Sequence, residues 1–585
     1  MDATKVSTMV IFKSIKTLRT VLTHGTAIAT IAIMASPAIA QVENATTIAD
    51  PARASQLLLN AGDMPKLFEK VEIEDAALQD APYGAENIAI NLEELRIDGV
   101  NIYKAEDLEP VYKDKLGSKV SLADIYGIAR DLTNKYRNDG YILTQVVVPP
   151  QTIEDGTVAL RVVEGFIDQI IIEGEERKSI VKHIRRLADN LRENNILNAK
   201  GLERYLLLIN DLPGITARSI LSPSKTLTGA SDLTIVVDRD IYEAEVSINN
   251  YGSRYLGPYQ ASFSDAANSW LGFNERIAGQ FVISGDKNNA DELLFGSVSY
   301  EQPVSRYGTK IGFSGSITST DPGYDLEQFD VNGLSKFLSA TISHPFVRSR
   351  TTNISGRATF DLRSVDSKNN LEPTRRDRIR SVRAGATFQF MDSMFGVGVN
   401  AIDVEVSKGV DLFGASSKGQ SNLTRANGDP EYTKIEVQAQ RLQRITSKLN
   451  LLIAGQGQLA AAPLLSSEEF GVGGMNIGRG YDSSEIIGDD GIAAKLELQW
   501  SEPRKIKYLK NYQLTASFDT GRVWNQDATT SAAKRDSLSS VGLGINANIT
   551  DKAIANFGVA LPLTREVDTR NSRNPRYYFN ITHKF

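Results

Sequence analysis

The run Lys495-Leu496-Glu497-Leu498-Gln499-Trp500 alternates strictly between polar and apolar residues, and this alternation decides the fold of the chain. Successive side chains of a strand point to opposite faces, so the run predicts a strand with one polar and one apolar face. The pattern recurs near residue 245, where Val246 and Ile248 interleave with Glu245, Ser247 and Asn249. Helical spacing is missing from about residue 240 onward, so we expect only strands and loops there.

The breaks between these strands are of two kinds. Short breaks carry Pro303, Pro345 and Pro503, whereas longer polar breaks cover Ser364 to Arg376, Gly409 to Glu431 and Asp527 to Asp536. Unequal turns at the two ends are typical of a transmembrane β-barrel, whose strands face lipid and lumen alternately. Residues 240 to 585 have room for about 16 strands. We therefore predict a transmembrane antiparallel β-barrel, with a soluble β-sandwich or propeller as the alternative.

The first 40 residues predict a secretory signal peptide. The basic residues Lys5, Lys13, Lys16 and Arg19 precede an apolar run from Ala27 to Ala35 and an Ala38-Ile39-Ala40 cleavage site. That apolar run is shorter than the ~20 residues that span a bilayer as a helix. The chain contains no cysteine, which excludes disulfides and thiolate sites, and its net charge of −6 argues against nucleic acid as a partner.

Residues 41 to 87 form an acidic, Ala-rich segment that we interpret as an N-terminal linker or a plug. A helix is possible from Ala52 to about Val71, with breaks near Gly62 and Pro65. Composition slightly favours a linker, and the sequence leaves both alternatives open.

Two small α+β units are predicted next, at residues 88 to 165 and 166 to 239. The first has the order strand, helix, helix, strand, strand, and its second helix begins after Ser121 as N-cap and stops at Gly140. In the second unit we expect a strand from Ile167 to Ile172, a helix with Ile180, Ile184, Leu187 and Leu191 on one face, a helix from Leu202 to Asn210 and a strand from Leu233 to Val237. Neither unit contains a catalytic constellation.

The glycine-rich stretch Gly471 to Tyr481 holds five glycines and a single arginine, Arg479. A guanidinium with five donors needs a carboxylate or carbonyl partner wherever such a loop comes to rest. Asp519 is the candidate, because it shares the polar face of its predicted strand with Thr515, Ser517 and Gly521. An ion pair in a water-filled lumen contributes about 0 to 1 kcal/mol, and more if its partners are desolvated. The alternative is a surface loop whose arginine meets solvent.

Several fragments carry a resemblance to a known family. In the first unit they are Gly140-Tyr141, Thr144, Val148-Pro-Pro-Gln151, Asp155-Gly156 and Val162-Val-Glu-Gly165, and in the second Leu202-Glu203, Leu207 to Gly214 and Ser231-Asp-Leu233. Beyond them come Asn250-Tyr-Gly-Ser-Arg254 with Gly257, and His344-Pro-Phe-Val-Arg-Ser-Arg350. In this order and spacing they resemble the outer-membrane transporters of two-partner secretion, the haemolysin secretion/activation type, with two POTRA domains before the barrel.

The resemblance implies a fold and a set of functional residues. Residues 88 to 165 and 166 to 239 would be periplasmic POTRA domains that bind an unfolded client at sites not yet assigned, and 240 to 585 the barrel. Gly478, Arg479, Gly480 and Tyr481 resemble the tip of a loop folded into the lumen, and Asp519 its partner on the inner wall. Two positions depart from the family pattern: Gly478, where Val or Ile is usual, and Ser517, where an aromatic is usual.

By the same resemblance, the protein would pass a secreted exoprotein through the outer membrane without nucleotide hydrolysis or a cofactor. Its other partners would be outer-membrane lipid and the barrel-assembly machinery, which would recognise the terminal Phe585. The sequence leaves the client and the oligomeric state open. The first alternative is a factor that inserts other barrels, and the second is a passive solute porin.

An enzyme is the remaining alternative, and the sequence offers little for it. His183, His344 and His583 are far apart, and we expect a polar helix position, a periplasmic turn and the last strand for them. The stretch 471 to 478 matches neither G-x-G-x-x-G nor a phosphate-binding P-loop. No His, Asp or Glu cluster has metal-ligand spacing, although Asp286 to Asp291 could hold calcium loosely; a solvated turn is the simpler interpretation.

Overall fold

The computed structural model describes residues 49–59, 80–193, 196–227, 229–287, 289–370, 374–502, 509–528, 530 and 534–585. The predicted signal peptide and Pro503 lie outside these ranges, as does most of the segment 41 to 87. Among the described helices, none combines the length and the apolar character that a membrane span requires.

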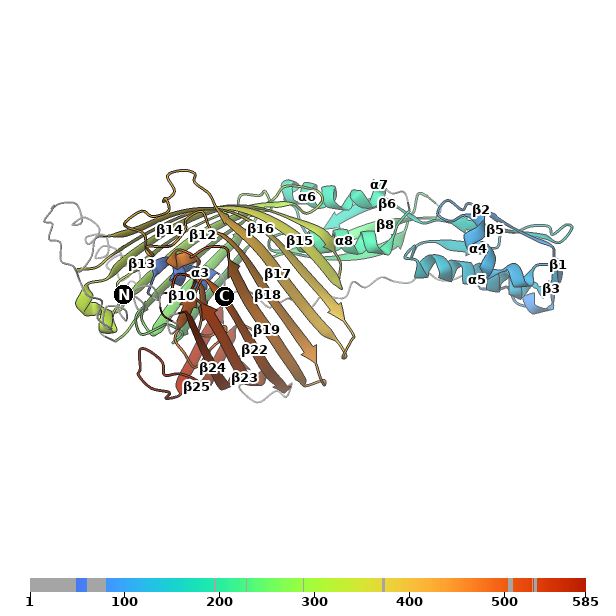
Figure 1. Cartoon of the computed structure of the whole chain (residues 1–585). Coiled ribbons are helices and arrows are strands. Elements are labelled where there is room, and N and C mark those ends of the chain that lie inside the picture. Colours follow the sequence, from blue (N-terminus) through green and yellow to red (C-terminus); the bar gives the residue numbers. More distant parts are fainter. Residues whose placement is uncertain are drawn as a thin grey trace, which may run out of the picture. The chain divides into compact units, whose positions relative to one another are not determined.

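A closed antiparallel barrel of 16 strands occupies the C-terminal part of the chain (Figure 1). Its strands are β9 (Tyr242–Asn249), β10 (Tyr259–Asn268), β11 (Arg276–Gly285), β12 (Leu293–Pro303), β13 (Lys310–Thr320), β14 (Asn332–Arg348), β15 (Thr352–Lys368), β16 (Arg375–Asp392), β17 (Gly398–Gly409), β18 (Thr433–Arg444), β19 (Leu449–Ala460), β22 (Asp490–Glu502), β23 (Asn511–Trp524), β24 (Arg535–Asn548), β25 (Ala553–Pro562) and β26 (Arg576–Lys584). The ring closes where β26 pairs with β9, in a register from Asn580 opposite Asn249 to Lys584 opposite Glu245. The prediction of a 16-stranded antiparallel barrel is confirmed.

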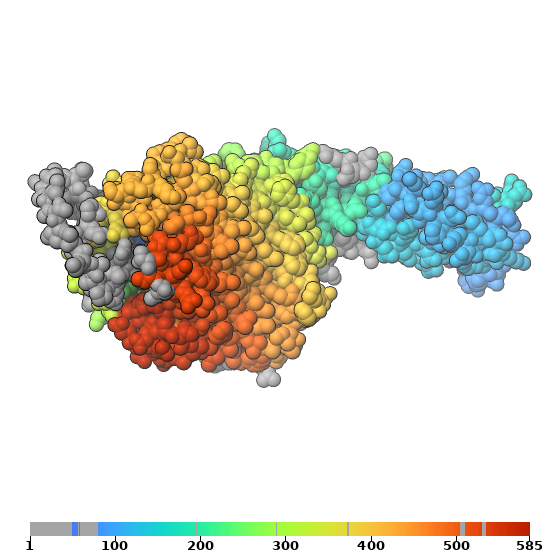
Figure 2. Space-filling view, viewed as in Figure 1, coloured from blue at the N-terminus to red at the C-terminus, as the bar shows by residue number. Residues whose placement is uncertain are grey.

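Alternation separates the two faces of the wall as the sequence predicted. Leu496 and Leu498 of β22 are exposed on the outside, whereas Glu497 and Gln499 are buried on the inside. On the face shown in Figure 2 the wall is unbroken from its yellow to its red strands. Every ladder group of such a wall is paired to a neighbouring strand, which is what a hydrocarbon environment requires.

Two of the predicted breaks differ in the structure. Pro345 does not lie in a turn but inside β14, where the register with β15 shifts between Pro345 and Val347. A proline cannot donate to the ladder, so a bulge of this kind accommodates it. The long break predicted at 364 to 376 is shorter, because β15 continues to Lys368 and β16 begins at Arg375.

The first small domain forms a three-stranded sheet in the order β2-β5-β4, with β2 parallel to β5. Its elements are η1 (Ala85–Asn87), β1 (Ala89–Leu92), β2 (Glu94–Asp98), α4 (Ala105–Leu108), η2 (Glu109–Val111), η3 (Lys113–Lys115), β3 (Ser118–Ser121), α5 (Leu122–Asn138), β4 (Gln145–Val147) and β5 (Thr157–Val163). Helix α5 begins after Ser121, whose hydroxyl accepts from the backbone N–H of Asp124 at 3.1 Å. This N-cap was predicted, whereas the small β1-β3 sheet was not.

The second small domain repeats the topology with the sheet order β6-β8-β7 and β6 parallel to β8. Its elements are β6 (Phe166–Glu173), α6 (Lys178–Ala188), α7 (Asn190–Glu193), α8 (Ala199–Asn210), β7 (Ile215–Pro223) and β8 (Ala230–Arg239). The predicted face of α6, including Ile180 and Ile184, is buried in the domain core. Strand β7, which the sequence analysis did not place, is an edge of this sheet.

Two segments lie inside the barrel. Helix α3 (Pro51–Leu59) packs against β13 and β14 (Figure 1). The loop between β19 and β22, residues 461 to 489, contains η5 (Ser466–Glu468), β20 (Phe470–Val472) and β21 (Ile486–Gly488), and we call it the lumen loop. The remaining short helix, η4 (Tyr324–Phe329), lies between β13 and β14.

Candidate functional site in the barrel lumen

The lumen loop folds inward as a hairpin because the wall makes room for it. Strands β20 and β21 pair antiparallel, and Phe470 and Val472 face the inner wall. A Cβ on Gly491 would stand 2.0 Å from Phe470 Cδ1, and one on Gly521 would stand 2.6 Å from Val472 Cγ1. A larger residue at Gly491 would overlap the Phe470 ring, and one at Gly521 would overlap the Val472 methyl groups unless Val472 were replaced as well.

Arg479 sits at the tip of this hairpin between two wall carboxylates. Its Nη2 donates to Glu497 Oε2 at 2.5 Å, and its backbone N–H donates to Asp519 Oδ2 at 3.1 Å. The Nε atom of Arg479 lies 3.7 Å from the same Asp519 oxygen. The structure therefore brings the two residues chosen from the sequence together, and adds a second acid.

The guanidinium and its partners are removed from water. The side chain of Arg479 is 8% exposed and that of Asp519 is 1% exposed. The ion pair is therefore desolvated, and it contributes more to loop seating than the about 0 to 1 kcal/mol expected for a pair in a water-filled lumen. Glu497 was missed, although the alternating run 495 to 500 already placed it on the same polar face as Lys495 and Gln499.

The departure at Gly478 has a direct structural cause. Gly478 has φ of 105°, a conformation that a β-branched residue does not adopt without strain. A Cβ there would also stand 3.0 Å from Gly473 Cα and 3.1 Å from Leu538 Cδ1. The departure at Ser517 leaves a small, buried side chain on the inner face of β23. These positions therefore fit a hairpin that approaches the wall closely.

Gly480 and Tyr481 complete the contact with the wall. A Cβ on Gly480 would stand 2.9 Å from the backbone nitrogen of Pro562, so only glycine fits. Tyr481 is fully buried, and its hydroxyl donates to the Ser539 carbonyl at 3.1 Å. Arg570 Nη2 in turn donates to the Gly480 carbonyl at 2.8 Å. All four predicted motif residues are thus packed against β23 to β25 or the loops beside them.

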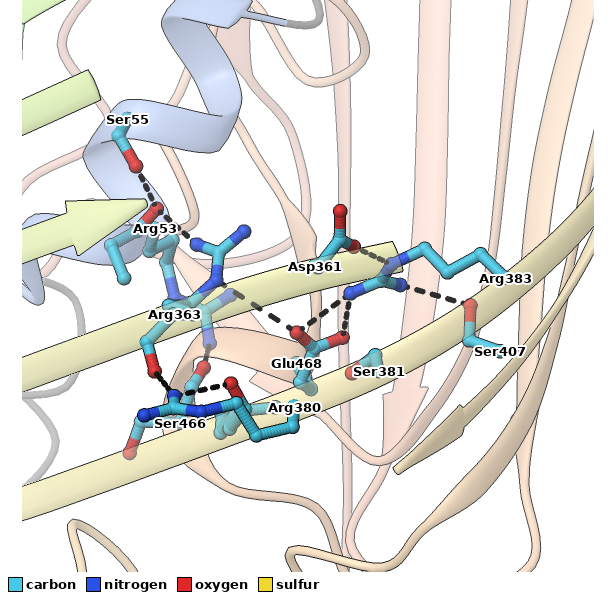
Figure 3. A network of polar contacts seen from close by, with 12 residues as sticks. Arg53, Ser55, Asp361, Arg363, Arg380, Ser381, Arg383, Ser407, Ser466 and Glu468 are labelled. Carbon is cyan, nitrogen blue, oxygen red and sulfur yellow. Dashed lines mark hydrogen bonds and ion pairs between the residues drawn. The ribbon is translucent and has the colours of Figure 1, made fainter. Parts of the chain in front are cut away.

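The base of the lumen loop carries the opposite charge pattern. Glu468 is fully buried, and its carboxylate lies 3.0 Å from Arg383 Nη2 (Figure 3). The same carboxylate lies 3.1 Å from Lys434 Nζ. Both cations belong to the wall, on β16 and β18. The loop therefore presents acids at its base to wall cations, and a cation at its tip to wall acids. Such a pattern fixes the register of the loop in the lumen.

Helix α3 is attached to the same base. Arg53 Nη1 donates to the Glu469 carbonyl at 3.3 Å, and Arg53 Nη2 lies 3.4 Å from Glu469 Oε2. Arg53 also donates to the carbonyl of Ser466, and wall residue Arg363 donates to the carbonyl of Ala52 at 3.2 Å (Figure 3). Helix, loop and wall are therefore one connected polar network. A helix beginning near Ala52 was predicted, but neither its place in the lumen nor these partners was.

Glu485, near the end of the lumen loop, is buried among acids. Burial, together with the nearby Asp482 and Asp568, raises the pKa of Glu485 to about 8. Its Oε1 accepts from the backbone N–H of Asp568 at 2.6 Å, which opposes the shift. The seated loop therefore binds this proton more tightly than a loop released into water, where the carboxyl pKa returns to about 4.5.

A pH dependence of loop seating follows from this shift. As pH rises from about 5 through 8, ionisation of Glu485 lowers the free energy of the released loop, while Glu485 in the seated loop stays protonated. The free energy that favours seating therefore decreases over this range and becomes constant above it. We expect a cysteine placed at the buried Ser484 to react faster with an alkylating reagent over that range, beyond the rise due to thiol ionisation. The Glu485→Gln variant provides the control, because it should show a smaller rise; burial also raises the pKa of Glu469, in the same loop, to about 7, so part of the pH dependence remains. Equal pH profiles for the two proteins would contradict the prediction.

The motif at residues 344 to 350 joins the barrel to the second small domain. Arg348 Nε and Nη2 donate to the two oxygens of Asp211 at 2.7 and 2.8 Å, in a bidentate pair. Arg350 Nε lies 3.3 Å from Glu203 Oε2. Both acids belong to or directly follow α8. The paired arginines of the motif are thus docking residues for this domain.

The three histidines considered as catalytic candidates lie on three different elements of the structure. His183 lies on α6, His344 on β14 and His583 on β26. His344 was expected in a turn, but it is in a strand, where Nδ1 lies 2.9 Å from Thr309 Oγ1. Within the described ranges, no group of His, Asp or Glu residues could hold a metal ion.

The chain matches known proteins along most of its length. Residues 229–547 match the model of the haemolysin secretion/activation protein ShlB/FhaC/HecB family, and residues 90–165 match the ShlB-type POTRA domain. The heme/hemopexin transporter protein HuxB of Haemophilus influenzae strain 86-028NP is 23% identical over 82% of this chain and 84% of its own. The outer membrane transporter CdiB of Dickeya dadantii is 22% identical over 77% of this chain and 81% of its own.

Solved structures share the fold. CdiB from Escherichia coli superposes with a TM-score of 0.70 at 17% identity, covering 95% of this chain and all of the other. BamA from Haemophilus ducreyi lacking POTRA domains 1-3 gives a TM-score of 0.51 at 14% identity, covering 85% of this chain and all of the other. The family model covers more than half of the sequence and includes most of the barrel and lumen loop described above. The chain belongs to the haemolysin secretion/activation protein family of outer-membrane transporters.

Proposed function

We propose that the lumen loop and α3 close the barrel at rest, and that both leave their places when the partner exoprotein passes. The protein is a two-partner secretion transporter of the outer membrane, with periplasmic POTRA domains and no enzymatic activity. The observation that carries the proposal is the network in which Arg479 binds Glu497 and Asp519, while Glu468 binds Arg383. Strands β20 and β21 of the loop pair with each other and not with a barrel strand, so the ring of strands remains intact without the loop.

The strength of this network suits a gate. Removing one partner of a buried ion pair costs about 3 to 5 kcal/mol, because the remaining charge is left unpaired. Separating the two ions costs much less free energy when water enters the lumen, because water then solvates each separated ion. A hydrated client that enters the lumen can therefore release the loop during passage. Truncation of one charged side chain instead weakens loop seating at all times, including when no client is present. Arg479 is the position where this difference should be largest.

We propose that the client first binds to the second small domain along β7. This edge strand and α8 line a cavity of about 1250 Å³ together with residues of β12 and β14 to β16. Ile220 of β7 lines this cavity and is 46% exposed. An extended segment can pair with such an edge through backbone hydrogen bonds, which tolerate many client sequences.

The Ile220→Asp variant tests this binding mode. Losing a half-buried contact and adding a charge should weaken client binding about fivefold to tenfold. We would measure binding of a fluorescent, unfolded N-terminal segment of the partner exoprotein to the full-length transporter. Leu227→Asp is the matched control, because Leu227 is 49% exposed on the same domain but outside the cavity lining. Equal weakening by both variants would argue against β7.

The assembly-factor alternative makes a different prediction for cells. Its support is the likeness to BamA, which shows a shared fold. Depleting an insertase lowers the amounts of many outer-membrane barrels, whereas depleting this transporter should remove one secreted protein and leave the other barrels unchanged. Quantitative proteomics of the envelope and of the medium separates the two outcomes.

We further propose that the barrel-assembly machinery recognises Phe585. This residue is 66% exposed, and its ring stacks edge-on with His583 at 4.8 Å between centroids. Its backbone N–H donates to the Ala244 carbonyl at 2.9 Å, which extends β26 beyond the last ladder pair. Phe585 therefore lies beside the strands that close the ring.

A further inference from the structure

The outward face of β14 to β16 is unusually basic near one end of the barrel. Strand β9 begins at Tyr242, directly after the last strand of the second periplasmic domain, so its first residue marks the periplasmic end. Counting antiparallel strands from there, β14 begins, β15 ends and β16 begins at the extracellular end. The residues concerned therefore lie at the level of the outer leaflet.

Alternation identifies which side chains face the membrane. Arg363 and Arg383 point into the lumen toward α3 and Glu468, so the residues of opposite parity point outward (Figure 3). The outward cations in these strand ends are Lys336, Lys368, Arg376, Arg378 and Arg380. The same outward positions contain a single carboxylate, Asp366.

The register gathers the cations into adjacent rows. Lys336 is opposite Ser364, which is opposite Arg378. In the next row toward the outside of the cell, Asp366 is opposite Arg376. Asp366 binds both arginines, with its Oδ1 at 2.8 Å from Arg376 Nε and 3.0 Å from Arg378 Nη2.

These pairs leave an excess of positive charge on a membrane-facing surface. In the described structure Lys336 is exposed and has no carboxylate within ion-pair distance, whereas Arg380 is buried and hydrogen-bonded to backbone carbonyls, so it adds little to this surface. The side chain of Arg376 remains 52% exposed despite its ion pair. Cations on the lipid face of a barrel are tolerated near the interface, and they attract anionic headgroups there.

An apolar groove lies beside the basic rows, one step further toward the periplasm. The next rows pair Leu338 with Leu362 and Ala340 with Phe360. Gly315, opposite Val298, leaves a gap of about 480 Å³. Its lining also includes Ile277, Tyr300 and Phe313. The exposed ring of Phe413 stacks edge-on with Phe360 at 5.9 Å between centroids.

We propose that this face is a binding site for a phosphorylated lipid of the outer leaflet. A phosphate group binds Lys336, Arg376 and Arg378, and an acyl chain of the same molecule lies in the groove around Gly315. Arginine guanidinium groups match phosphate oxygens in a bidentate geometry, and a phosphomonoester carries more negative charge and one more free oxygen than the phosphodiester of a zwitterionic headgroup. The groove accepts a chain because its lining is almost wholly apolar.

Native mass spectrometry of the full-length transporter in detergent tests the site. The probes are bisphosphorylated lipid A, the same lipid after phosphate removal, and phosphatidylethanolamine. We expect the bisphosphorylated form to be retained, and the double variant Lys336→Glu with Arg376→Glu to lower its retention about tenfold. Arg522→Glu is the matched control, because Arg522 is an exposed cation at the extracellular end of β23 and should leave retention unchanged.

Two further variants separate the headgroup from the chain. Gly315→Leu fills the groove and should weaken retention of the phosphorylated lipid although every cation remains. Asp366→Asn frees two arginines and should strengthen retention, a gain that misfolding cannot produce. Equal retention of the dephosphorylated lipid, full retention by the double variant, or displacement of the lipid by millimolar inorganic phosphate would each overturn the proposal.

Discussion

Replacing Arg479 with alanine is expected to reduce secretion of the partner exoprotein to a few per cent of the wild-type level or less. The substitution leaves Glu497 and Asp519 buried without their cation, which costs about 3 to 5 kcal/mol of loop seating. We expect the loop then to lose its register on the wall and to obstruct the lumen through which the client passes. Arg479 belongs to no barrel strand, so the amount of barrel in the outer membrane should stay nearly unchanged. Immunoblots of the medium and of the membrane fraction measure both quantities.

Two comparisons sharpen this prediction. Arg573→Ala removes an exposed cation from the loop between β25 and β26 and should leave secretion intact. The exchange Arg479→Asp with Asp519→Arg should recover only part of the activity, because Glu497 then faces an aspartate. Adding Glu497→Gln to the exchange should improve recovery. Normal secretion by Arg479→Ala would remove the motif from the mechanism.

Reversing the charge of Arg53 is the change with the second largest expected effect. Arg53→Glu places a carboxylate against Glu469 and the carbonyl of Ser466, so α3 should leave the lumen. We expect a frequently open pore in planar bilayers, with a severalfold rise in mean conductance, and greater sensitivity of cells to large antibiotics. The wild-type protein should remain mostly closed under the same conditions.

The matched control for this variant is Gln56→Glu. It introduces the same carboxylate into the same helix at a half-buried position, with a net charge change of −1 instead of −2, and should change the conductance little. If Arg53→Glu conducts like the wild type, helix α3 does not close the pore. If both variants open it equally, the cause is the charge of the helix rather than the contact made by Arg53.

The barrel was predictable because each strand by itself alternates between polar and apolar residues with a period of two. Alternation in the run 495 to 500 fixes the strand and also its lumen face, on which Glu497 lies. Helix α5 was predictable for a similar reason, since the Ser121 cap and the apolar face are local signals. Strand β7 has less contrast between its faces, and it owes its place to pairing with β8.

The contacts within the lumen could be predicted only in part. Asp519 was found because an isolated acid on a small, polar strand face needs a cation. The partner of Arg53 could not be found, because Glu469 is separated from it by 416 residues and neither sequence context marks the pair. Gly491 and Gly521 likewise look ordinary in sequence, and their role appears only when Phe470 and Val472 are placed against them.

The central claim is that the lumen loop must leave the inner wall during transport. A disulfide between cysteines at Val472 and Gly521 tests it, because Val472 methyl carbons lie 2.6 and 3.1 Å from where a Cβ on Gly521 would stand. The natural chain has no cysteine, so this pair would supply the only thiols. Each single cysteine variant controls for the substitution itself.

The measurement is the amount of exoprotein secreted by the double variant before and after reduction of the disulfide. The account predicts at least an about tenfold loss while the disulfide is closed, and recovery to the level of the single variants once a reductant opens it. Undiminished secretion with the disulfide fully formed would contradict the account, because the loop would then never have to move.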